Sequence, residues 1–159
     1  MITRLAPALS SAGGLFLAGL GIAVVVGLLV GGGAAPLLIV DPGPTVRWGI
    51  PVAKALVHLG AALSIGSLMV AAFVLTRRQK AFSSALLVAS IGAALLTVAS
   101  AATAFMTFMA IYVEPVSIDQ RFGDLLWLYL QSTEIGRGWL ITMGLGAVVT
   151  VLTVVVRSF

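Results

Sequence analysis

The sequence contains no cysteine, a single histidine and few charged residues. The lack of cysteine excludes disulfide bonds and thiolate metal sites, and it leaves the redox compartment undetermined. Charged residues make up 9% of the 159 residues and hydrophobic residues 60%, with a mean hydropathy of +1.18. Soluble domains have about 25% charged residues. This composition therefore indicates an integral membrane protein.

Motifs for catalysis and for nucleic-acid binding are also lacking. The chain has no Gly-rich phosphate loop, no paired carboxylates within an apolar run and no nucleophile next to a base. The formal charge is +4 and the pI is near 10.4. However, the basic residues are scattered singly, apart from Arg77, Arg78 and Lys80. We therefore expect a protein that is not an enzyme, that does not bind nucleic acid and whose cations set its topology.

Four apolar runs are each long enough to cross a bilayer, which takes about 20 helical residues. They predict an all-α, polytopic membrane protein, with four transmembrane helices and an outer amphipathic interfacial helix in one bundle over residues 1–159. The expected spans cover about 11–40, 52–76, 82–113 and 139–156, and the outer loops cover 41–51 and 114–138.

The first apolar run has small residues at every fourth position: Gly19, Ala23, Gly27 and Gly31. This spacing puts them on one stripe and favours close contact with another helix, although glycine is common in membrane helices in general. A cleaved signal peptide is the competing interpretation, because a basic residue precedes the run and small residues follow it.

The segment from Asp41 to Gly60 contains a turn, a membrane anchor and the only histidine. The prolines and glycine between Asp41 and Pro44 predict a tight turn. Arg47 and Trp48 are typical of the headgroup level, and Pro51 suits the first turn of a helix. His58 then lies about two turns into the second span, where an ionisable side chain is a candidate functional residue.

The segment from Glu114 to Gly138 holds four of the five acidic residues. Its hydrophobic residues follow the spacing of one helical face, which predicts an amphipathic helix in the membrane interface; they are Phe122, Leu125, Leu126 and Tyr129. Gly136 and Gly138 are expected to loosen the chain before the last span.

The distribution of charge predicts the orientation. One side has five cations and no acid, and the other has four cations and all five acids. The tight basic cluster also lies in the shortest loop. Both termini are therefore expected to be cytoplasmic.

Two loop motifs resemble a known family. The run DPGPTVRWGIPVAKAL from Asp41, and STEIGRGWL from Ser132 to Leu140, are similar to the beginning of actinobacterial membrane proteins that join a CopD-like copper-resistance part to a CtaG-like cytochrome c oxidase assembly part. The resemblance implies a multi-pass protein of the bacterial plasma membrane. It also implies that the chain is the amino-terminal piece of a longer protein, without the CtaG-like part.

The resemblance further implies copper transport, or copper delivery towards a haem–copper oxidase. Imidazole and thioether groups suit Cu(I) where thiolates are missing. We expect His58, Met106, Met109 and Met143 to share a depth of roughly 6 to 10 Å below the outer boundary and to form the metal site. Alternatively, the methionines fill gaps in the bundle and His58 bonds a carbonyl or a serine.

Two classes of function remain open at this stage. The first is a copper-handling module with copper as its cofactor. The second is a non-catalytic structural or assembly subunit that docks on a respiratory membrane complex. The expected partners are the lipid bilayer, a haem–copper oxidase or another respiratory complex, and other helices of the longer chain.

Overall fold

The computed structural model describes residues 5–33, 35, 41–76, 80–112, 116 and 119–158, and this part of the chain forms five helices. They are α1 (Leu5–Val30), α2 (Pro44–Phe73), α3 (Lys80–Tyr112), α4 (Gln120–Ser132) and α5 (Glu134–Ser158). The prediction of an all-helical protein is confirmed.

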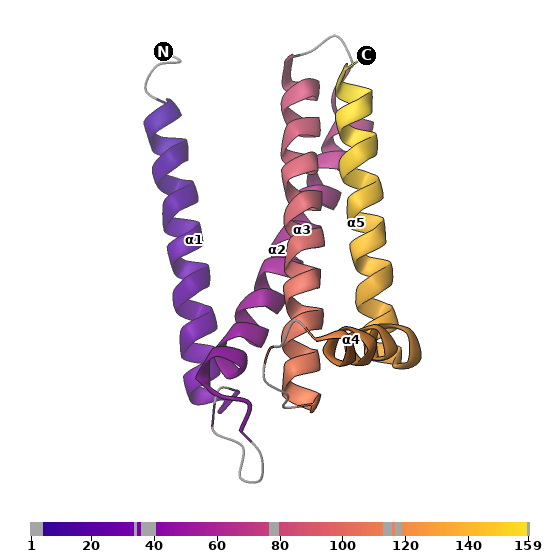
Figure 1. Ribbon diagram of the computed structural model, residues 1–159. Coiled ribbons are helices and arrows are strands. Elements are labelled where there is room, and N and C mark those ends of the chain that lie inside the picture. The colour runs from indigo at the N-terminus through magenta and orange to yellow at the C-terminus, as the bar shows by residue number, and fades with distance from the viewer. Residues whose placement is uncertain are drawn as a thin grey trace.

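Helix α3 is the centre of the bundle (Figure 1). It packs against α2, α4 and α5, whereas α1 makes a small contact with α2. α2 crosses behind α3 at an angle, α5 runs alongside α3, and α4 lies across one end. The start of α1 and the end of α5 lie at the opposite end from α4.

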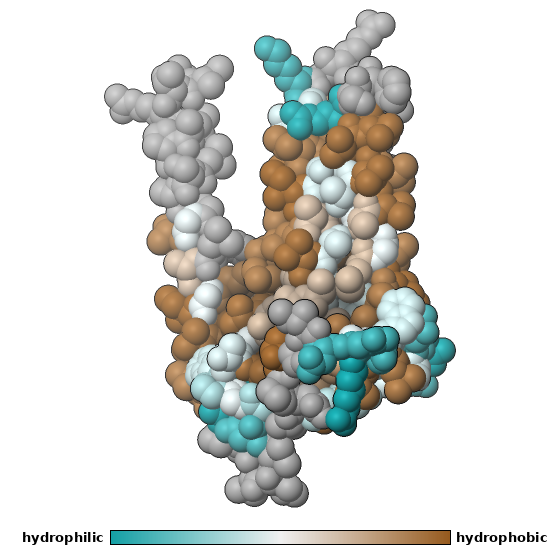
Figure 2. All heavy atoms as spheres, in the orientation of Figure 1, coloured by the Kyte–Doolittle hydropathy of each residue, from teal (hydrophilic) through white to brown (hydrophobic). Residues whose placement is uncertain are grey.

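Three helices, α2, α3 and α5, are long and apolar enough to cross a membrane. In α1, the apolar stretch found among the described residues is the shorter Ala18–Val30, so three candidate spans are shown and the fourth expected span remains a prediction. Figure 2 shows a hydrophobic band along the bundle with hydrophilic residues gathered at its two ends. This distribution is the one expected for a protein in contact with a lipid bilayer.

Small residues allow α2 and α3 to cross at close range. A Cβ atom added to Gly60 would lie 2.7 Å from the backbone nitrogen of Leu96 and 2.8 Å from the carbonyl oxygen of Gly92. A Cβ on Gly92 would lie 2.6 Å from the backbone nitrogen of Ser64. Gly60 and Ser64 are both buried in this crossing. A small residue also allows a close contact between α3 and α5, where Gly146 packs on Thr97.

The start of α2 differs from the prediction. Helix α2 begins at Pro44, so residues 44–51 are helical and do not form a loop. Pro44 is favourable there because the first helical N–H has no partner within a helix. Gly43, at φ 90°, ends the preceding turn, and its N–H donates to the Asp41 carboxylate at 3.0 Å. Pro51 lies inside the helix and does not start it.

The predicted outer loop 114–138 is also largely helical. The amphipathic helix is confirmed as α4, and α5 starts at Glu134, five residues before the expected position. Thr133 joins the two helices: its hydroxyl donates to the Tyr129 carbonyl at 2.7 Å and accepts the Gly136 N–H at 2.9 Å. Gly136 is buried against α4, so it fixes the corner and does not loosen the chain.

The small-residue stripe of α1 faces away from the described bundle. Gly19, Ala23 and Gly27 are exposed, and an added Cβ at Gly19 or Gly27 would meet nothing within 4 Å. The neighbouring positions Val24 and Leu28 are less exposed. The stripe is therefore not a contact within the part of the bundle that is described, and contact with a partner remains a prediction.

Candidate functional site

The four candidate copper ligands come from three helices. His58 is in the middle of α2, Met106 and Met109 are near the end of α3, and Met143 is in the first half of α5. The methionines are partly buried, whereas His58 is exposed. No hydrogen bond or ion pair to His58 is present among the residues that the structure describes.

Met106 packs against the beginning of α2. Its sulfur and terminal methyl group lie where a Cβ of Gly49 would stand. Further along the same pair of antiparallel helices, Gly60 lies beside Leu96. These two contacts fix the register of α2 against α3.

The register separates His58 from Met106. His58 follows Gly49 by nine residues, which is about 13 Å along a helix axis. Counted from the start of α2, His58 is about 21 Å into the helix, whereas Met106 is about 9 Å from the end of α3. The expected shared depth assumed a second span starting at Val52, and α2 starts eight residues earlier.

Met143 faces a different part of the bundle. It lines a cavity of about 220 Å³ with Phe105 of α3 and Leu126 and Leu130 of α4. This lining is apolar, so the thioether fills space at the junction of three helices. The structure therefore brings Met143 to α4 and Met106 to Gly49, and it does not gather the four candidates at one point.

A site built from harder ligands is also lacking in the described part of the chain. Its His, Cys, Asp and Glu residues form no group of three or more that could hold a metal ion. Met106 and Met109 are three residues apart on α3 and therefore lie near one face of that helix. Their thioethers are candidate ligands for a soft metal.

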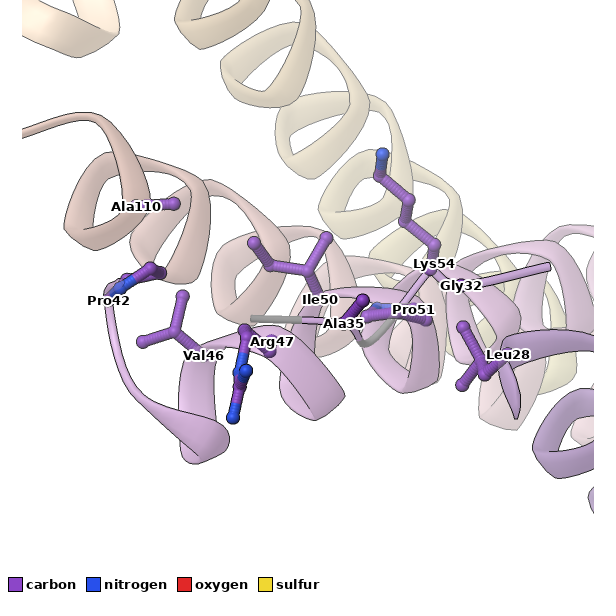
Figure 3. A pocket seen from close by; sticks show the side chains of 11 residues that line it. Leu28, Gly32, Ala35, Pro42, Val46, Arg47, Ile50, Pro51, Lys54 and Ala110 are labelled. Atoms are coloured by element: carbon purple, nitrogen blue, oxygen red, sulfur yellow. The ribbon is translucent and has the colours of Figure 1, made fainter. Parts of the chain in front are cut away.

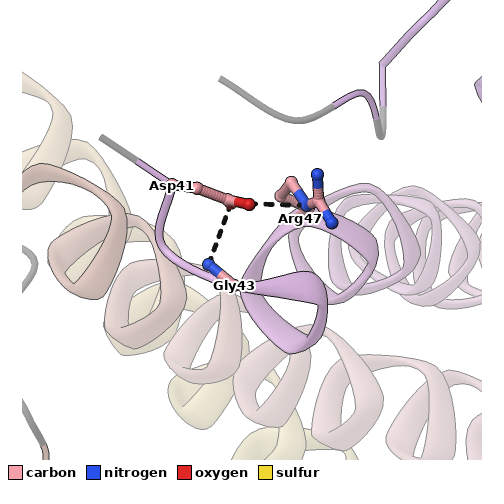
Figure 4. A network of polar contacts seen from close by, with 3 residues as sticks. All are labelled: Asp41, Gly43 and Arg47. Carbon is pink, nitrogen blue, oxygen red and sulfur yellow. Dashed lines mark hydrogen bonds and ion pairs between the residues drawn. The ribbon is translucent and has the colours of Figure 1, made fainter. Parts of the chain in front are cut away.

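A polar network at the start of α2 was not predicted. The Arg47 Nε atom lies 3.5 Å from a carboxylate oxygen of Asp41, which also accepts the Gly43 N–H (Figure 4). The Arg47 side chain is 16% exposed. Its Nε and Nη1 atoms are buried without a hydrogen-bond partner in the described structure. The sequence places Asp41 and Arg47 six residues apart, but the pairing depends on the turn at Gly43.

An aromatic cluster holds α4 against α3. Phe108 and Tyr129 are fully buried, with ring centroids 5.7 Å apart, and Phe122 meets Phe108 edge to face at 5.3 Å. The Tyr129 hydroxyl has no hydrogen-bond partner among the described residues. Burial, and secondarily the neighbouring Tyr112, raise the pKa of Tyr129. The cluster is structural, because it presents apolar rings and one neutral hydroxyl.

Comparisons with known proteins found no relative of this chain. No family model, no curated protein and no solved structure matches this chain. The geometry of the described residues is therefore the basis for any functional inference.

Proposed function

We propose that this chain is a non-catalytic module of a membrane assembly, which packs against a further transmembrane helix along one face of α2. The observation that carries the proposal is His58, an exposed imidazole at the middle of a helix apolar enough to span a membrane. Polar groups within the hydrocarbon are costly unless another group bonds them.

The rest of this face supports the same conclusion. Ile65 and Met69 follow His58 by seven and eleven residues, which is one side of an α-helix. Ile65 is 62% exposed and Met69 is 56% exposed. The opposite side of α2 contains Val57, Gly60 and Ser64, which are buried. The His58 face, defined by His58, Ile65 and Met69, is thus an exposed surface of the described bundle with a polar group at one end.

The partner helix should carry a hydrogen-bonding side chain at the depth of His58. The chain has no acidic residue between Asp41 and Glu114, so α2 and α3 of a second copy cannot supply a carboxylate to the His58 face. The resemblance suggests two sources for the partner in a bacterial plasma membrane. One is a helix of a longer chain of the same protein, and the other is a helix of a haem–copper oxidase or another respiratory complex.

A single substitution separates packing against a helix from exposure to lipid. His58→Leu should weaken the complex if a partner helix bonds the imidazole, because that partner group is then left unpaired. In lipid, the same substitution should stabilise the protein, since it removes a polar group from hydrocarbon.

The measurement is photo-crosslinking in membranes from a probe at position 65, with and without His58→Leu. We expect one protein adduct that falls several-fold in the variant. A probe at Val98 on α3, which is 68% exposed, is the matched control. Adducts of equal yield from positions 65 and 98, or a more stable His58→Leu protein with unchanged adducts, would contradict the proposal.

Copper handling is the second candidate function. It is supported by the loop motifs that resemble a copper-related family and by the adjacent thioethers of Met106 and Met109. Competition with a Cu(I) chelator in detergent, without oxygen, tests it. If these two residues bind copper, Met106→Leu with Met109→Leu should lower the affinity at least tenfold, whereas Met69→Leu should not. If His58 contributes, His58→Ala should also lower the affinity. No binding by the wild-type protein would reject copper handling by this chain.

A further inference from the structure

A basic cavity lies beside the first turns of α2. Its volume is about 450 Å³, and it is enclosed by the end of α1, the turn that follows α1, the start of α2 and Ala110 of α3. Figure 3 shows Arg47 and Lys54 extending from α2 towards opposite sides of the cavity, with Ile50 between them. Among the described residues that line it, no other side chain is charged.

The positive charge of this cavity is incompletely balanced. Asp41 is close to Arg47, but it contacts one nitrogen at 3.5 Å and forms no hydrogen bond with the guanidinium in the described structure. Lys54 is exposed and has no acidic partner among the residues that are described. Two cations therefore face a single carboxylate. A guanidinium with two buried nitrogens that lack hydrogen bonds is stabilised by an added anion, and phosphate oxygens match its donor geometry.

The remaining lining is apolar. Leu28, Val46, Ile50 and Pro51 line the same cavity as the two cations. A free inorganic anion would not use this surface. An amphiphile with an anionic headgroup would use both parts, because its phosphate would meet Arg47 while its glycerol and the first carbons of its acyl chains would meet the apolar wall.

The position of the cavity in the bundle agrees with such a ligand. It lies where α2 begins and α3 ends, next to Trp48, at one end of the hydrophobic band (Figure 2). Phospholipid headgroups occupy this level of a bilayer, and basic pockets between transmembrane helices bind them. The four-carbon stem of Lys54 lets its ammonium group reach that level from a position ten residues into α2.

We propose that this cavity binds an anionic phospholipid from the surrounding bilayer, with its phosphate at Arg47 and with the charge of Lys54, on the other side of the cavity, adding to the attraction. The lipid fills the space between α1 and α2, two helices that otherwise contact each other little. It thereby attaches α1 to the rest of the bundle. The cavity lies on the same side of α2 as the His58 face but nearer the start of the helix, since Lys54 and Arg47 precede His58 by four and eleven residues. The proposal does not depend on copper or on a partner helix.

Native mass spectrometry of the full chain, released from lipid nanodiscs, tests the proposal. The nanodiscs contain equal amounts of phosphatidylglycerol and phosphatidylcholine, which have similar acyl chains and differ in net charge. We expect one retained phosphatidylglycerol per protein, in clear excess over phosphatidylcholine. Arg47→Gln and Lys54→Gln should each lower this preference about fivefold, the effect of about one cation near the membrane surface.

Two further variants distinguish the cavity from general charge. Arg137→Gln removes an exposed cation of α5 that does not line the cavity, so it should leave the preference unchanged. Ala35→Phe fills the wall opposite α2 without changing the charge, and it should lower retention of both lipids. Helix content by circular dichroism confirms that each variant folds.

Three results would overturn the proposal. The first is equal retention of the two lipids by the wild-type protein. The second is an equal loss of preference in Arg137→Gln and in the Arg47 and Lys54 variants, which would indicate nonspecific charge. The third is thermal stabilisation by millimolar inorganic phosphate equal to that by phosphatidylglycerol, which would identify a soluble anion as the ligand.

Discussion

The crossing of α2 and α3 makes a quantitative prediction for Gly60→Ala. The added Cβ would lie 2.7 Å from Leu96 N, 2.8 Å from Gly92 O and 3.0 Å from Leu96 Cα. All three are backbone atoms, so no rotamer change relieves the contacts and the two helices must separate by several tenths of an ångström. Overpacking of this kind costs about 1–3 kcal/mol. The higher helix propensity of alanine offsets about 0.5–1 kcal/mol of this cost, because the unfolded chain is less flexible with alanine than with glycine.

Gly66→Ala is the matched control, since it is the same substitution in the same helix. A Cβ there meets nothing within 4 Å, so the variant has the gain in helix propensity without the clash. The difference in free energy of unfolding between the two variants isolates the clash, and we expect Gly60→Ala to be less stable by about 2 kcal/mol. That difference corresponds to about a thirtyfold change in the unfolding equilibrium.

The assay is reversible unfolding in mixed micelles by titration with sodium dodecyl sulfate, followed by far-ultraviolet circular dichroism. Gly92→Ala should behave like Gly60→Ala. The double variant should lose less than the sum of the two, because one separation of the helices relieves both contacts. If Gly60→Ala and Gly66→Ala agree within about 0.5 kcal/mol, the close crossing is refuted.

Further predictions concern the aromatic cluster, α1 and the topology. Tyr129→Phe removes a buried hydroxyl that has no partner among the described residues, so the free energy of unfolding should rise by up to about 1 kcal/mol. Burial raises the pKa of Tyr129, so the folded protein keeps this proton at pH values where the unfolded chain loses it; stability should fall above about pH 10, and less so in Tyr129→Phe. Gly27→Leu should leave the stability of the bundle unchanged but should weaken association if the exposed stripe of α1 contacts a partner. Single cysteines at Thr45 and Ser132 should react with an impermeant thiol reagent outside the cell, whereas one at Gln79 should not; labelling at Gln79 alone would reverse the orientation.

Local periodicity was sufficient to predict α4. Its hydrophobic residues repeat at helical spacing among charged ones, and that signal depends on no contact elsewhere in the chain. Tyr129, the last member of that pattern, is indeed the most buried residue of α4. The start of α2 could not be predicted in the same way, because prolines at 44 and 51 bound the segment between them and both suggest a break. Pro44 lies in the first turn, where a missing N–H costs little, and Pro51 is accommodated about two turns later within the helix.

Spacing of small residues predicts a surface for close packing but does not identify what occupies it. Gly60 and Ser64 are buried against α3, as that spacing suggests. Gly19 and Gly27 have an equally regular spacing and face open space in the described bundle. The difference lies in the partner, since Gly92 of α3 is placed to meet Gly60, whereas no described helix faces the stripe of α1. Such a pairing is a property of two helices and their register, which a single sequence does not contain.

The same reasoning explains why a metal site spanning several helices is harder to predict than the helices themselves. The depth of each ligand is measured from the end of its own helix, so an error in one helix start moves one ligand against all the others. Starting α2 at Val52 rather than at Pro44 displaces His58 by eight residues, or about 12 Å along the axis, which is several times the length of a bond between copper and its ligand. Met106 and Met109 share one helix, so their separation does not change with such an error. Two thioethers on one helix are for this reason the part of the copper hypothesis that does not depend on where another helix starts, and copper binding by them stays a prediction.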